Sequence, residues 1–95
     1  MNARRQVISQ FSGMSIDMDY MLCIPSVHAM FNNESITMDF SGGIRDISPN
    51  FPPSKVSLLR KWVLLHRNEI EGNHMRCGHN EFPLMTIEPL DEFAI

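Results

Sequence analysis

Residues 52–73 read PPSKVSLLRKWVLLHRNEIEGN, and this stretch decides the fold. Its apolar residues recur at steps of three and four, which places them along one face of an α-helix. Pro53 suits the first turn of a helix, where backbone N–H groups have no intrahelical partner. We therefore expect a helix that begins near Ser54 and packs on the rest of the chain through Val56, Leu59, Trp62, Val63, His66 and Ile70.

The end of this helix is less sharply marked. Gly72 and Asn73 are suitable C-cap residues, but the polar run to Cys77 could also extend the helix or start a second one. The segment Pro83-Leu84-Met85-Thr86-Ile87-Glu88-Pro89-Leu90 then reads as an extended tail. The prediction is one long C-terminal helix, with or without a kink, followed by this tail.

The first half of the chain carries the pattern of β-strands. Residues 14–22 alternate apolar and polar side chains, as a strand with one buried face does. Residues 7–11 form a preceding strand in this interpretation, and Gly13 supplies the turn between the two.

A second hairpin is expected further along, where residues 27–31 meet residues 35–40 across Asn32-Asn33-Glu34. Ile36, Met38 and Phe40 would face the core, and Gly42-Gly43 would turn the chain into a short segment at 44–47. Strands first and helix last predict an α+β domain with an antiparallel sheet of three to five strands.

Composition limits the function classes. With 95 residues and a net charge of −3, the chain reads as one domain, 1–95, and lacks the basic surface that nucleic acid requires. No segment has the length and hydropathy of a membrane span. The only cysteines, Cys23 and Cys77, would make a single bridge, so we expect reduced thiols and a cytoplasmic protein.

Several motifs within residues 8–90 have the spacing of one known family. Residues 8–13 match that family's opening strand and glycine, and His28-Ala29 falls where its members end a Pro-Pro-His-Phe-His-Ala run, of which this chain keeps one proline and one histidine. The matching C-terminal residues are Trp62, Leu65, His66, Glu69, Asn73, Pro83, Leu84, Ile87, Glu88, Pro89 and Leu90. Over these residues the chain resembles a small prokaryotic family catalogued as domain of unknown function 4160. The resemblance implies a compact α+β domain, often predicted to lie in toxin–antitoxin-like gene pairs or on mobile elements, with no established activity.

Acidic residues are the first candidates for binding a partner. The alternation places Asp17, Asp19 and Asp39 on the outer face of the sheet, with Glu34 at a nearby turn. Such a surface suits a basic partner, although a solvated outer face explains the same pattern. Met21 interrupts the polar side of its strand and could form an exposed patch with Leu22, Ile24 and Phe31, for a partner or for a second copy in a homodimer.

Metal binding and proton transfer are weaker alternatives. His74, Cys77 and His79 could join Cys23 and His28 around a soft metal ion, but the spacing fits a polar surface turn better than a zinc motif. No metal or cofactor is therefore predicted.

Trp62, His66 and Ile70 are expected to anchor the core. His66 has the titration range of a general base, yet the sequence assigns it no nucleophile, so no catalytic residue is predicted.

Three functions follow from this pattern. The first is a non-enzymatic protein-binding module of a toxin–antitoxin-like or mobile-element system. The second is a phage or mobile-element inhibitor of a host defence complex, of the anti-CRISPR kind. The third is a small nuclease-like toxin that uses His28 or His66 with Arg45 or Arg67.

Overall fold

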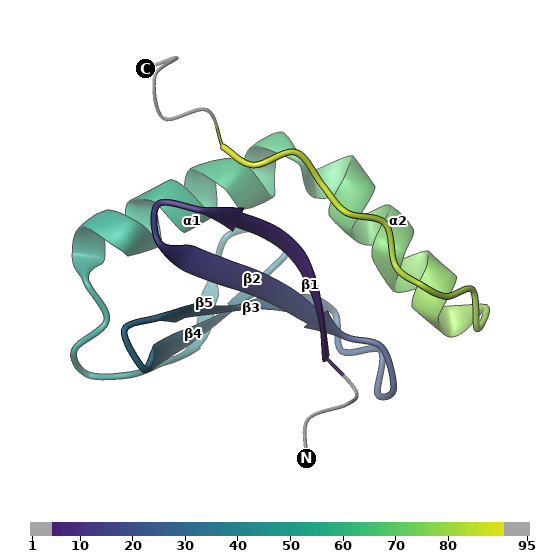
Figure 1. Ribbon diagram of the computed structural model, residues 1–95, viewed down its shortest axis with the longest axis horizontal. Coiled ribbons are helices and arrows are strands. Elements are labelled where there is room, and N and C mark those ends of the chain that lie inside the picture. Colours follow the sequence, from purple (N-terminus) through teal and green to yellow (C-terminus); the bar gives the residue numbers. More distant parts are fainter. Residues whose placement is uncertain (1–4, 91–95) are drawn as a thin grey trace.

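The computed structural model describes residues 5–90 and shows an α+β arrangement in which two helices and a tail lie against one antiparallel sheet (Figure 1). The sheet has five strands in the order β1-β2-β3-β4-β5, so every strand pairs with its neighbour in sequence. The elements are β1 (Arg5–Phe11), β2 (Met14–Asp19), β3 (Ser26–Phe31), β4 (Glu34–Asp39), β5 (Ile44–Ile47), α1 (Pro53–Leu65) and α2 (Arg67–Gly78).

Tight turns connect β1 to β2 and β3 to β4, as the sequence predicts. Ser12 and Gly13 have φ angles of 52° and 76°, and Asn32 and Asn33 have φ angles of 48° and 66°. Two successive residues with positive φ form the kind of turn whose twist matches that of the flanking strands. Asparagine and glycine tolerate this conformation better than other residues, which makes both hairpins readable from the sequence.

One face of the sheet is buried and the other is not covered by a helix. Alternate residues of β2, β3 and β4 point into the core, where Ile16, Val27, Ala29 and Met38 have no exposed surface. Both helices lie on this face (Figure 1). The opposite face carries the polar residues of the same strands, and we call it the uncovered face.

Trp62 lies at the centre of the core. Its side chain has no exposed surface, and its ring centroid lies 5.6 Å from that of Phe11 on β1. The indole Nε1 donates a hydrogen bond of 2.8 Å to the carbonyl oxygen of Glu88 in the tail. One residue of α1 therefore holds the sheet and the tail together.

The expected single helix is in fact two helices. His66 has φ −107° and ψ 24°, far from helical values, and separates α1 from α2. On either side of this break, α1 packs Leu59, Trp62 and Val63 into the core, and α2 adds Ile70 and Cys77 to the same core. Of the helix ends that the sequence leaves open, the structure has the later one, since α2 continues through Gly72 and Asn73 to Gly78.

Two polar side chains, the buried Asn73 and the half-buried Gln6, hold the tail. Asn73 on α2 is 1% exposed; its Nδ2 donates to the carbonyl of Met85, and its Oδ1 accepts from the Met85 N–H. Gln6 on β1 makes the equivalent pair of hydrogen bonds with Leu84. The N–H of Ile87 donates to the carbonyl of Ile8 at 2.8 Å, so the tail covers the outer edge of β1.

The opposite edge of the sheet is β5. All four of its residues are exposed, including Ile44 and Ile47, and its pairing with β4 is interrupted by a bulge at Arg45. Short length, a bulge and charged side chains are features that discourage an edge strand from pairing at random.

Candidate functional site

The uncovered sheet face places Asp17, His28 and Thr37 side by side on β2, β3 and β4. Asp17 is on the predicted face, but the expectation that it is solvated is wrong, because the residue is only 8% exposed. His28 Nδ1 lies 3.1 Å from Asp17 Oδ2, and the guanidinium of Arg5 lies 3.8 Å from Asp17 Oδ1. Neighbouring strands thus cover this carboxylate.

The Asp17–His28 contact fixes the imidazole. The carboxylate can only accept, so His28 Nδ1 carries the proton of this hydrogen bond, and Nε2 is the acceptor in the neutral ring. The two side chains line a hollow of about 80 Å³ together with Arg5, Asp19, Ile24, Ser26 and Thr37. This arrangement provides a fixed hydrogen-bonding group at the surface, and in chemical terms it could also transfer a proton.

Asp19 organises the loop between β2 and β3, residues 20–25. Its Oδ1 accepts hydrogen bonds of 2.8 Å from the backbone N–H groups of Met21 and Leu22. These bonds hold the start of the loop while its side chains point outward: Met21 is 66% exposed, Leu22 58% and Ile24 40%. Phe31, which was expected to join this patch, instead packs against the core, with Lys55 Nζ 4.8 Å from its ring centroid.

Asp39 has the same role at the turn between β4 and β5. Its Oδ1 accepts hydrogen bonds from the Ser41 hydroxyl, the Ser41 N–H and the Gly43 N–H. These bonds, led by the one from the Ser41 hydroxyl, lower the pKa of Asp39 below its ordinary value of 3.8, with a further contribution from Arg45.

The lowered pKa of Asp39 predicts a pH-dependent cost for Asp39→Asn. The ionised carboxylate contributes stability above pH 3.8 and loses that contribution as the pH falls through the lower folded-state value. We expect the variant to be less stable than the wild-type protein near neutral pH, with the gap closing below pH 3.8. Urea unfolding across this range measures the gap; a constant gap would contradict the assignment.

Three of the predicted acidic residues lie together and one does not. Asp19 and Asp39 flank Ser26 at one end of the uncovered face, about 10 Å apart at two strand spacings, and Asp17 lies beside them. We call these three aspartates the acidic corner. Glu34 lies at the other end of β4, opposite Phe31, and takes no part in it.

The sequence interpretation missed one acidic residue. Asp46 is exposed and lies opposite Thr37, so it extends the row of polar residues on the uncovered face. The bulge at Arg45 disturbs the alternation that would have assigned Asp46 to this face.

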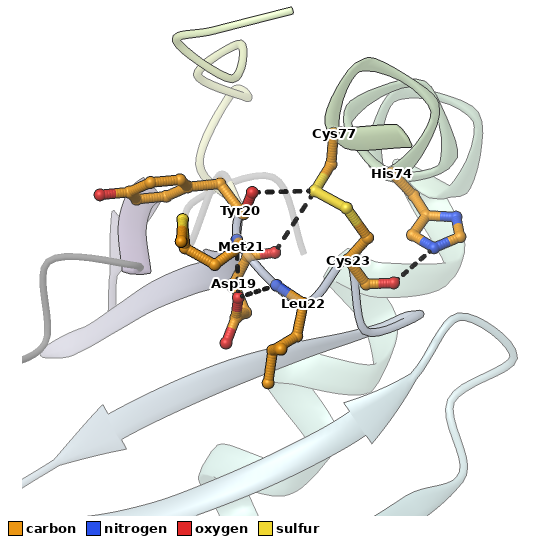
Figure 2. Close-up of a disulfide and its surroundings, with 7 residues drawn as sticks. All are labelled: Asp19, Tyr20, Met21, Leu22, Cys23, His74 and Cys77. Carbon is orange, nitrogen blue, oxygen red and sulfur yellow. Dashed lines mark hydrogen bonds between the residues drawn. A yellow bond between two sulfur atoms is a disulfide. The ribbon is translucent and has the colours of Figure 1, made fainter. Parts of the chain in front are cut away.

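Cys23 and Cys77 form a disulfide, which corrects the expectation of reduced thiols. Figure 2 shows that the bond joins the end of the β2–β3 loop to α2. His74 on α2 adds a contact of 2.9 Å from its Nε2 to the carbonyl oxygen of Cys23 (Figure 2). The loop with exposed Met21 and Leu22 is therefore fixed at both ends, by Asp19 at its start and by α2 at its end.

The metal hypothesis gains no support from the arrangement. Within residues 5–90, no group of three or more His, Cys, Asp or Glu side chains is placed to hold a metal ion. Cys77 is bonded to Cys23, His74 contacts a carbonyl oxygen, and His79 follows the last residue of α2.

The residues proposed for a nuclease-like toxin are divided between two places. His66, with a side chain 13% exposed, contacts Glu69 at 2.6 Å, and Arg67 pairs with Glu71 at 3.1 Å along α2. His28 lies on β3, on the uncovered sheet face, and β4, β5 and α1 separate it in the chain from α2. Of the expected core anchors, Trp62 and Ile70 have no exposed surface.

Comparison with known proteins gives no match: no protein-family model, no curated protein and no solved structure is similar to this chain. The resemblance to domain of unknown function 4160 stays a prediction. None of the helices within residues 5–90 is long and apolar enough to cross a membrane.

Proposed function

We propose that this protein is a non-enzymatic protein-binding module whose partner docks on the β2–β3 loop and the acidic corner beside it. The main observation behind the proposal is the exposure of the Met21 and Leu22 side chains. Both side chains are more than half exposed at the tip of a loop that is fixed at both ends.

A fixed apolar loop is a favourable docking element. Exposed methionine and leucine give the loop apolar surface to bury, and the flexible thioether adapts to different shapes. Because the loop is already held by Asp19 and by the disulfide, binding costs less conformational entropy than ordering a mobile loop would.

The surrounding charge indicates the kind of partner. Around the uncovered face, Asp17, Asp19, Asp39 and Asp46 outnumber Arg5, which lies beside Asp17, and Arg45, whose charge acts on Asp39. Complementary charge speeds encounter and sets orientation more than it adds affinity. The partner is therefore a protein segment that carries lysine or arginine next to an apolar side chain.

Met21→Gln tests this surface, because it removes an apolar side chain without changing the charge. Leu65→Gln is the matched control, since Leu65 is also 66% exposed but lies at the end of α1. We expect a stoichiometric partner, captured from host lysate and identified, to bind Met21→Gln about tenfold or more weakly, the loss of one central apolar contact. Titration of the purified partner by calorimetry measures the ratio.

The control variant should bind as the wild-type protein does, and the association rate should fall as salt is added. Equal losses for Met21→Gln and Leu65→Gln would reject this docking surface. Salt is a better probe of charge here than substitution of Asp19 or Asp39, because both carboxylates also hold turns together.

The resemblance described above supports a toxin–antitoxin-like or mobile-element setting in the cytoplasm, and we include both in the proposal. The identity of the captured protein separates this reading from inhibition of a host defence complex. A toxin or antitoxin supports the first, and a subunit of a defence complex supports the second.

A further inference from the structure

We propose that the Cys23–Cys77 disulfide is a redox gate for this binding surface: the oxidised protein displays the β2–β3 loop in its docking conformation, and reduction releases it. This inference rests on the proposed function and adds its regulation. An intracellular disulfide is usually transient or redox-sensing rather than structural, so a cytoplasmic setting and this bond are compatible in a switch.

The loop depends on the bond for its C-terminal attachment. Cys23 has a φ angle of 52°, a left-handed conformation that residues other than glycine rarely adopt without outside support. The disulfide and the contact between His74 Nε2 and the Cys23 carbonyl supply that support from α2 (Figure 2). Reduction removes the covalent attachment and leaves the His74 contact alone to hold a strained residue.

The buried sulfur has a partner ready for the reduced state. Cys77 is 3% exposed, and its Sγ lies 3.2 Å from the carbonyl oxygen of Tyr20. A disulfide sulfur has no hydrogen, so in the oxidised protein this is a close contact. After reduction the Cys77 thiol can donate a hydrogen bond to the same carbonyl, and no buried polar group loses a partner.

The two sulfurs differ in access, which gives the reaction a direction. Cys23 is half-buried and Cys77 is buried, so a thiolate from a dithiol reductant attacks Cys23 Sγ. The S–S bond breaks, Cys77 leaves as a thiolate and takes a proton from water, and a mixed disulfide forms at Cys23. The second thiol of the reductant then displaces Cys23. In sum, two electrons and two protons pass to the protein, and the reductant becomes a disulfide.

Release of the loop changes the surface on which the partner docks. Met21 and Leu22 keep their bonds to Asp19 only while the loop conformation persists, and Ile24 lies next to Cys23. A mobile loop must be ordered again when the partner binds, so the reduced protein should have lower affinity.

Hydrogen exchange of the loop tests the gate on the protein itself. We expect backbone amides of residues 20–24 to exchange at least about tenfold faster after reduction with dithiothreitol, whereas the β3–β4 hairpin keeps its protection. Alkylation and mass measurement establish that both cysteines are reduced. Cys23→Ser should show the fast exchange without reductant, and tryptophan fluorescence should confirm that Trp62 stays buried.

A fully reduced protein with unchanged loop exchange overturns the gate, and so does a reduced protein that unfolds as a whole. The binding readout is separate: the Met21-dependent partner should bind the reduced protein about tenfold or more weakly. If reduction releases the loop but leaves the affinity for the partner unchanged, the proposal that the disulfide regulates binding is wrong, although the disulfide still controls the loop. If no partner depends on Met21, the proposed function fails, and the exchange result shows independently whether the bond controls the loop.

Discussion

Replacing Trp62 with alanine is expected to destabilise the protein by about 3–5 kcal/mol, the usual cost of removing a buried aromatic side chain. The indole has no exposed surface, contacts Phe11 and donates a hydrogen bond to the Glu88 carbonyl. Since a domain of this size is stable by only about 5–15 kcal/mol, the variant should be close to unfolding. Urea denaturation followed by circular dichroism measures the change.

Trp62→Phe separates the two contributions. The phenyl ring keeps much of the packing against Phe11 but cannot donate to Glu88, so we expect a smaller loss than with alanine. The loss should be concentrated in the tail, where residues 83–90 become more accessible to proteases. Equal destabilisation by phenylalanine and alanine would show that the hydrogen bond, and not the packing, dominates.

Loss of the disulfide is the second large effect that we expect. The bond joins cysteines 54 residues apart, and closing a loop of that length restricts the unfolded chain by up to about 4 kcal/mol, with about 2–4 kcal/mol typical in practice. The urea midpoint should therefore fall when dithiothreitol is added. A Cys23→Ala/Cys77→Ala variant should have the lower midpoint in either condition, and a midpoint that ignores reductant in the wild-type protein would contradict the assignment.

Much of the sheet could be predicted from the sequence because local conformational preferences and tertiary structure agree there. The alternation from Met14 to Asp19 and the paired asparagines at 32 and 33 need no information from the rest of the chain. The break at His66 is different. The apolar spacing continues through it to Ile70, so nothing in the local pattern marks the residue at which one helix becomes two.

The candidate site shows what a period of two residues can and cannot reveal. The alternation assigns Asp17 to the uncovered face. It does not reveal that the carboxylate is buried, because the residues that cover it, Arg5 and His28, lie on neighbouring strands. The disulfide was missed for a similar reason. Two cysteines separated by 54 residues carry no local sign of contact, and the rule that small disulfide-bonded domains carry several bridges pointed the wrong way.

The tail that covers the edge of β1 has a consequence for self-association. Within residues 5–90, β5 is the one strand whose outer side has no neighbouring segment bonded to it, whereas the tail occupies the outer side of β1 at Ile8. A sheet that can grow from both sides can form fibres, but a sheet that can grow from one side stops after two molecules have joined. Any assembly by strand pairing would therefore end as a closed pair, so the tail protects this small protein against polymerisation.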